Sequence, residues 1–138
     1  MSRSLARKIS LALGIVYVLV GVLGFIPGIT VVNGMAPGQG LLLGIFAVNT
    51  IHNLAHLVLG AALIWAATSD NVRMVNKGLA VVFAILVLGS LIAPIVEGVA
   101  INPPDTGLHL LSLLVTAAIG FMPVPAGEAR GAREHVAA

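Results

Sequence analysis

The chain has 138 residues, of which 59% are hydrophobic and 9% are charged. Its 16 glycines raise the apolar share to roughly 71%, well above the ~45–50% of a soluble globular domain. A soluble fold of this length cannot bury so much apolar surface, and a net charge of only +2 at this hydrophobicity excludes intrinsic disorder. The absence of cysteine excludes disulfide frameworks, Fe–S clusters and thiolate zinc sites. The composition is that of an integral membrane protein.

Four apolar stretches are long enough to cross a bilayer, and they predict spans at about 9–26, 49–67, 78–97 and 103–122. The first stretch follows basic residues, as in a signal peptide. It is longer than a typical signal-peptide core, however, and no A-x-A cleavage site follows it, so we interpret it as a retained helix. Pro94 is expected to bend the end of the third span. The fourth begins at Asn102-Pro103, a typical N-cap followed by proline at the first helical position.

The predicted fold is therefore an all-α membrane bundle of four helices. Residues 1–122 are expected to form one membrane domain. Residues 123–138 are small, polar and charged, and they are expected to form a disordered cytoplasmic tail.

All seven Lys and Arg residues lie on one side of a four-span arrangement: Arg3, Arg7, Lys8, Arg73, Lys77, Arg130 and Arg133. The other side carries only Glu97 and Asp105, near helix ends. The positive-inside rule makes the basic side cytoplasmic, so both termini are expected there, whereas three or five spans would split the basic residues. The positions of the basic residues thus indicate membrane orientation, with the lipid bilayer as partner, and no nucleic acid.

Residues 28–48 are expected to form a long connection on the outer side. Residues 29–40 are rich in glycine and turn-forming residues, whereas residues 41–48 are apolar and too short to span. The apolar part either lies at or dips into the membrane interface, or extends the second helix. We favour a helix break at Asn49.

The second and fourth spans begin with the same pattern, N-x-x-[H/D]-x-x-x-H. It is formed by Asn49, His52 and His56 in one span and by Asn102, Asp105 and His109 in the other. A duplicated helical hairpin explains this match. Two hairpins of the same orientation are expected to be related by a pseudo-twofold axis along the membrane normal.

Residues spaced by three and four positions share one face of a helix, so each set of polar side chains is expected to point into the bundle at equal depth. Three imidazoles and one carboxylate, from His52, His56, His109 and Asp105, would suit tetrahedral zinc. If Glu97 joins them from the third span, iron or manganese becomes plausible. Asn49 and Asn102 would then be outer partners that orient the imidazoles.

Other interpretations of the same residues stay open. Asp105 can pair with a histidine across the helix interface, which would make the site a metal-free polar clamp. Haem ligation is less favoured than zinc because the aromatic residues available to wall a haem pocket are few: one Trp, one Tyr and four Phe. Quinone or proton chemistry is a further alternative.

The stretch from Asn49 to Gly60, with its HNxxHL string, together with the later Asp105-x-x-x-His109, resembles a bacterial family of small membrane proteins known as domain of unknown function 4383. The resemblance extends from the first span to the fourth. It implies four membrane helices in the bacterial cytoplasmic (inner) membrane, and it implies no activity.

The sequence is therefore consistent with three functions. The first is a small membrane bundle with an inward-facing His/Asp site near the outer leaflet that binds a metal ion. The second is an accessory or structural subunit of a larger membrane complex, or a self-associating one, in which the polar residues clamp helices together. The third is a proton-relay or transport unit in which the histidines titrate near neutral pH. The P-loop, dinucleotide, nucleophile-elbow and HExxH motifs are absent from the sequence, so no enzyme class is indicated.

Overall fold

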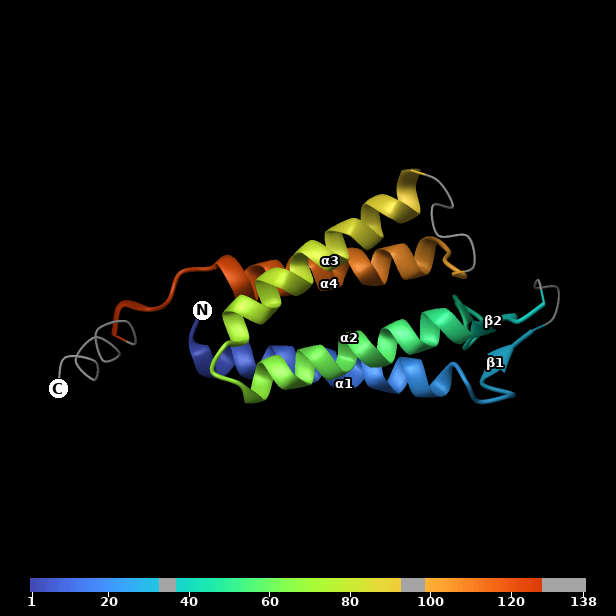
Figure 1. Cartoon of the computed structure of the whole chain (residues 1–138), viewed down its shortest axis with the longest axis horizontal. Helices are drawn as coiled ribbons and strands as arrows, with labels where there is room; N and C mark the ends of the chain where they lie inside the picture. The colour runs from blue at the N-terminus through green and yellow to red at the C-terminus, as the bar shows by residue number, and fades with distance from the viewer. Residues whose placement is uncertain (33–36, 93–98, 128–138) are drawn as a thin grey trace.

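A computed structural model describes residues 1–32, 37–92 and 99–127 of the chain. It contains four helices, α1 (Arg3–Leu23), α2 (Thr50–Thr68), α3 (Val72–Ile92) and α4 (Pro103–Phe121). Three short strands, β1 (Thr30–Val31), β2 (Gln39–Leu42) and β3 (Phe46–Asn49), lie between α1 and α2 (Figure 1). All four helices are long and apolar enough to cross a membrane, which confirms the predicted four-helix membrane fold.

The helix bounds differ from the expected spans mainly at the basic ends. α1 begins at Arg3 rather than at Ile9, because Ser2 caps it: the Ser2 hydroxyl accepts a hydrogen bond from the Leu5 amide at 3.2 Å. α3 likewise begins at Val72, several residues before the apolar stretch. The polar first turns of both helices thus continue the helix beyond the apolar run. The expected bend at Pro94 lies outside the described residues.

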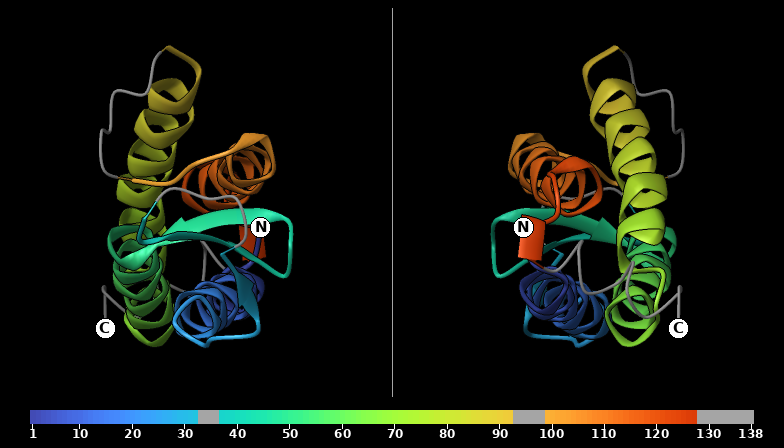
Figure 2. Two further views of the ribbon diagram at one scale, coloured as in Figure 1. Left: turned by 90° about the vertical axis from the view of Figure 1, so that its right-hand side faces the viewer. Right: turned by 90° about the vertical axis from the view of Figure 1, so that its left-hand side faces the viewer.

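The helices pack as two pairs, α1 with α2 and α3 with α4 (Figures 1 and 2). Glycines bring the first pair close together. A Cβ added to Gly14 would lie 2.9 Å from the Gly60 carbonyl oxygen, and one added to Gly60 would lie 2.9 Å from the Gly14 carbonyl oxygen. Close contact through small residues is typical of membrane helix pairs. The pairing matches the two hairpins of the sequence repeat, and the pseudo-twofold axis stays a prediction.

Burial is distributed as in a protein that faces lipid. Leu11, Ile15 and Leu19 recur every four residues along α1 and are exposed. The interior contains buried aromatic residues, among them Tyr17 and Phe83, together with a large set of buried polar side chains: Ser10, His52, Asn53, His56, Asn76, Asp105, His109, Ser112 and Thr116. The apolar exterior is the surface that a bilayer would cover.

Both helix pairs share a basic end, here called the loop end, where residues 69–71 connect α2 to α3. There Arg3 and Arg7 both contact the Asp70 carboxylate, at 2.7 and 3.1 Å. Arg73 donates to the backbone carbonyls of Met1 and Met122, so the start of the chain and the end of α4 meet at this end of the bundle. The three strands lie at the opposite end, called the sheet end (Figure 1).

Residues 41–48 do not extend α2; they belong to β2, β3 and the turn between them. Strands β2 and β3 pair antiparallel, with Gln39 opposite Asn49 and Leu42 opposite Phe46. Strand β1 pairs antiparallel with the other edge of β2, so β2 is the central strand. The tight turn uses positive φ values at Leu43 and Gly44, 54° and 74°. The favoured helix break at Asn49 is confirmed, since Asn49 ends β3 and is the N-cap of α2.

Candidate metal site

The site is positioned by the first turns of α2 and α4, which are built alike. The Asn49 side-chain oxygen accepts a hydrogen bond from the His52 amide at 2.9 Å. The Asn102 side-chain oxygen accepts one from the Asp105 amide at 3.4 Å, and the Asp105 carboxylate accepts one back from the Asn102 amide at 3.1 Å. These contacts are N-caps, the second a capping box with reciprocal bonds. They set where each helix begins and therefore which residues face inward.

Three histidines meet in the interior, just inside these first turns. His52 and His56 come from α2 and His109 comes from α4, and each is at most 3% exposed. One ring nitrogen from each of the three residues lies within 4.8 Å of the others. The ring centroids are 4.3 Å apart for His52 and His56, 6.0 Å for His52 and His109, and 5.9 Å for His56 and His109. These three buried residues can hold a metal ion.

The orientation of His52 is set by the segment that precedes α4. Its Nδ1 lies 2.5 Å from the Ala100 carbonyl oxygen, which can only accept. Nδ1 therefore carries the proton, and in the neutral ring Nε2 offers its lone pair toward the cluster. That Nε2 lies 3.1 Å from Nε2 of His56. A carbonyl that holds the far nitrogen of a ligating imidazole is the usual outer partner in metal sites.

Several polar atoms of the cluster lack partners. Nδ1 of His56, Nδ1 of His109 and Oδ1 of Asp105 are buried and make no hydrogen bond to any residue in the described part of the chain. A buried polar atom left unsatisfied costs about 1–3 kcal/mol, so such atoms call for an explanation. Each of these three atoms therefore has hydrogen-bonding capacity that the described residues do not use.

Asp105 is buried beside the cluster but is not part of the group of converging ligand atoms. Its Oδ2 is already bonded to two backbone amides, those of Ala47 in β3 and Asn102, each at 3.1 Å. Its Oδ1 is the atom with free capacity. The carboxylate therefore fastens the sheet to α4, and only one of its oxygens is available for other chemistry.

The two asparagines act as helix caps. Asn49 and Asn102 accept from backbone amides as helix caps, and Asn102 also donates through Nδ2 to the Ile45 carbonyl oxygen at 2.8 Å. The Ala100 carbonyl makes a contact that orients the His52 ring. The outer-partner role of the two asparagines stays a prediction. Glu97, the carboxylate considered as a further ligand, lies outside the described residues.

Two aromatic rings form the inner wall of the cluster. Tyr17 of α1 meets the His56 ring edge-on with centroids 5.1 Å apart, and Phe83 of α3 lies 6.1 Å from the His109 ring. The Tyr17 hydroxyl and Ser112 Oγ are 2.8 Å apart. Because Ser112 Oγ also donates to the Leu108 carbonyl, it accepts from Tyr17. All four helices thus contribute to the cluster or to its wall.

Ser112 was not among the predicted site residues, although the sequence contains a signal for it. Asp105, His109, Ser112 and Thr116 follow the same three-and-four spacing and all are buried on one face of α4. A second buried network lies nearer the loop end, where Asn76 Nδ2 donates to Ser10 Oγ at 3.1 Å and Ser10 Oγ donates to the Leu63 carbonyl at 2.9 Å. Along α4, the buried polar residues thus continue beyond His109 to Ser112 and Thr116.

A protein-family model matches most of the chain. The model of the family described as Domain of unknown function (DUF4383) matches residues 7–122, which include the three histidines of the cluster, α2, α3 and α4, and all but the first four residues of α1. No curated protein and no solved structure matches the chain.

Proposed function

Because the chain belongs to the family Domain of unknown function (DUF4383), which supplies no activity, we propose a function from its own residues: it binds a divalent metal ion within the membrane bundle. His52, His56 and His109 are the proposed ligands, and zinc is the first candidate. The observation that carries this proposal is the convergence of three buried imidazoles.

The chemistry of the donor set supports zinc. Neutral imidazoles are good ligands for zinc, whereas calcium and magnesium prefer oxygen atoms, and three protein ligands are typical of zinc sites with an open position. Tetrahedral zinc with bonds of about 2.0–2.1 Å places its ligand nitrogens roughly 3.3 Å apart. The 3.1 Å between Nε2 of His52 and Nε2 of His56 is close to that spacing. His109 would move slightly toward them on binding.

Asp105 is the candidate for the remaining position, directly or through a water molecule. Its free Oδ1 is buried beside the histidines, and its other oxygen is held by two amides, which limits how far the carboxylate can move. A carboxylate would also lower the net charge of a divalent site in a medium of low dielectric constant. Under the orientation expected from the basic residues, this site lies near the outer leaflet of the bacterial inner membrane, with both termini in the cytoplasm.

A second candidate function is a metal-free clamp in a structural or accessory subunit. It is favoured by the hydrogen bonds that tie separate segments together at this point, from Ala47 to Asp105 and from His52 to Ala100. Polar contacts of this kind hold membrane helices together without a ligand. We place the metal first because ring nitrogens of three buried histidines converge within 4.8 Å of one another, which a clamp does not require.

Elemental analysis of the purified protein tests the proposal. The protein in mild detergent is loaded with Zn²⁺ or Co²⁺, freed of excess metal, and analysed for metal per chain and for the visible absorption of tetrahedral Co²⁺. We expect about one ion per chain in the wild type, and a loss of at least about tenfold in affinity for His56→Ala, since one of the ligands is gone.

The variant His135→Ala is the matched control, because it removes the fourth histidine of the chain, which belongs to the tail expected to lie in the cytoplasm. It should bind metal as the wild type does. Equal loss of metal in His135→Ala and His56→Ala would mean adventitious binding, and a wild type that retains no metal would reject the metal function.

A further inference from the structure

The turn between β2 and β3 has a leucine in a conformation that leucine rarely adopts. The Ile45 amide closes this turn by donating to the Leu42 carbonyl at 3.0 Å, so Leu43 and Gly44 are its central residues. Both have positive φ, 54° and 74°, as in the type I′ turn that favours Asn-Gly. Leucine is disfavoured there because its Cβ crowds the backbone. Leu43 is 62% exposed, so packing within the described part of the chain does not compensate for this strain.

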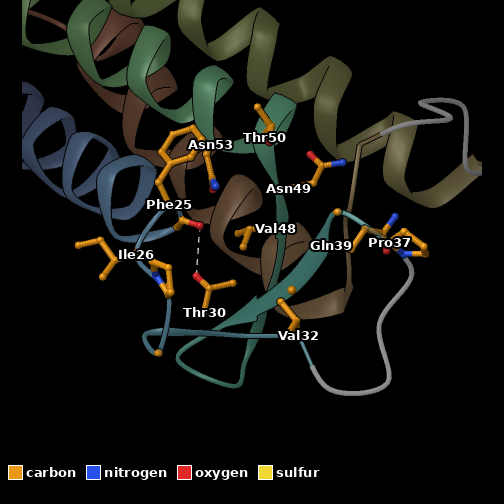
Figure 3. A pocket seen from close by; sticks show the side chains of 15 residues that line it. Phe25, Ile26, Thr30, Val32, Pro37, Gln39, Val48, Asn49, Thr50 and Asn53 are labelled. Atoms are coloured by element: carbon orange, nitrogen blue, oxygen red, sulfur yellow. Dashed lines mark hydrogen bonds between the residues drawn. The ribbon is translucent and has the colours of Figure 1, made fainter.

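The surroundings of this turn are apolar and uncharged. Ile45 is also 50% exposed, and Leu43 and Ile45 are together called the hairpin tip. A pocket of about 670 Å³ beside the sheet likewise has no charged side chain among the described residues that line it (Figure 3). The sequence contains no Asp, Glu, Lys or Arg in residues 9–69, whereas about 25% of residues are charged in soluble domains. The sheet end therefore has the composition of a segment in contact with lipid.

The hairpin tip lies at the level where the membrane spans end. Asn102 is the N-cap of α4, and its Nδ2 donates to the Ile45 carbonyl oxygen at 2.8 Å. Helices α2 and α4 each have 19 residues, or about 28 Å of helix, which is close to the ~30 Å of the hydrocarbon core. A segment beside the first residue of such a helix lies where the hydrocarbon meets the headgroups.

The sheet is also placed to reach the surrounding lipid. In the end-on views of Figure 2 the sheet lies across the ends of the helices, and the turn between β2 and β3 reaches the edge of the bundle. The exposed apolar surface of the helices extends to this level, since Ile51 in the first turn of α2 and Phe25 just after α1 are both exposed. The hairpin tip thus continues the lipid-facing surface of the four helices.

We propose that the hairpin tip inserts into the lipid–water interface of the bilayer, with Leu43 and Ile45 as its anchors. Burial of their side chains in lipid compensates for the strained conformation of Leu43. Because the same sheet holds Ala47 against Asp105, the anchor fixes the sheet relative to both the bilayer and α4. The inference depends neither on the metal function nor on which side of the membrane the sheet end faces.

A fluorescent probe at a single cysteine tests the proposal, since the natural chain has no cysteine. Ile45→Cys keeps the hydrogen bonds of the turn, which are made by the backbone. The full-length variant is labelled with an environment-sensitive fluorophore and reconstituted in phosphatidylcholine vesicles, with or without a nitroxide near the head of the acyl chain. We expect blue-shifted emission that the nitroxide lipid quenches and that iodide on both sides of the membrane does not.

Asn71→Cys is the matched control, because Asn71 is exposed at the loop end. Its probe should emit as in water and be quenched by iodide. The same behaviour at Ile45 would overturn the proposal. Blue-shifted emission at Ile45 that neither agent quenches would also overturn it, because the tip would then be buried against a second copy of the chain or another protein. Leu43→Cys supplies a second probe position if Ile45→Cys does not fold.

Leu43→Asn, combined with the probe at Ile45, tests the strained residue itself. Asparagine is favoured at this position of the turn, so the hairpin is retained while the apolar side chain is lost. We expect weaker quenching by the nitroxide lipid and stronger quenching by iodide. Met74→Asn replaces an exposed apolar side chain near the loop end and should leave the probe unchanged. Unchanged quenching in Leu43→Asn would show that Leu43 is not an anchor, and the proposal would fail.

Discussion

The backbone amide of Ala47 donates a hydrogen bond to Oδ2 of Asp105 at 3.1 Å, across 58 residues of sequence. This contact joins β3 to the first turn of α4. Because β3 runs directly into the Asn49 cap of α2, the sheet ties the start of α2 to the start of α4. The short sheet therefore supports the histidine cluster, because it helps to set the distance between His52 and His109.

Replacing Asp105 should destabilise the sheet end. Asp105→Ala would leave the buried amide of Ala47 and the amide of Asn102 without acceptors, and we expect a loss of about 1–3 kcal/mol in the free energy of unfolding for each amide that finds no new partner. Asp105→Asn keeps an oxygen at this position and should lose less. Unfolding in SDS measures these differences. Asp70→Ala is the control, because it removes two exposed ion pairs, each worth at most about 1 kcal/mol. A smaller effect for Asp105→Ala than for Asp70→Ala would contradict the role given to this carboxylate.

A double-mutant cycle of His52→Ala and His109→Ala distinguishes the metal from the clamp. The two rings belong to one cluster with centroids 6.0 Å apart, so we expect a coupling of about 0.5–3 kcal/mol in the free energy of unfolding. If a shared metal ion produces the coupling, it should be present with zinc and fall after treatment with EDTA. Coupling that is equal in both conditions would support the clamp, and additive effects would show that the two residues do not serve one site.

Gly60→Ala should weaken the pairing of α1 with α2. The added Cβ would lie 2.8 Å from the Val18 amide nitrogen and 2.9 Å from the Gly14 carbonyl oxygen, and these backbone atoms cannot move without separating the helices. We expect a loss of about 1–3 kcal/mol, measured as unfolding in SDS. At Gly89 the same change meets no atom within 4 Å, so Gly89→Ala should be neutral or slightly stabilising. Equal effects at both positions would argue against close glycine packing.

The orientation in the membrane can be tested with single cysteines, since the natural chain has none. Asn71→Cys at the loop end and Pro37→Cys at the sheet end are both exposed. The positive-inside rule places the basic loop end in the cytoplasm, so an impermeant maleimide should label Pro37→Cys on intact cells and Asn71→Cys only after lysis. The reverse pattern would invert the proposed topology.

Local patterns in the sequence were enough to predict the membrane class, the number of helices and the start of α2. Hydrocarbon thickness requires long apolar stretches, and an asparagine that caps a helix acts on residues only three positions away. The three-and-four spacing also placed His52 with His56, and Asp105 with His109, on one face each, because helical geometry alone decides this.

Contacts between distant segments decided the rest. The run Leu41-Leu42-Leu43 is apolar without the alternation that predicts a strand. Strand β2 therefore could not be predicted from this run, because its hydrogen bonds come from pairing with β3. The carbonyl that orients His52 belongs to Ala100, and the amide that donates to Asp105 belongs to Ala47. Every residue has a backbone carbonyl, and nearly every residue has an amide, so no sequence motif predicts which of them makes a contact. The separation of the Asp105 carboxylate from the three converging imidazoles is likewise a property of how two helix pairs meet. Helix faces follow from sequence spacing, whereas the atoms that meet across those faces depend on the packing of the whole bundle.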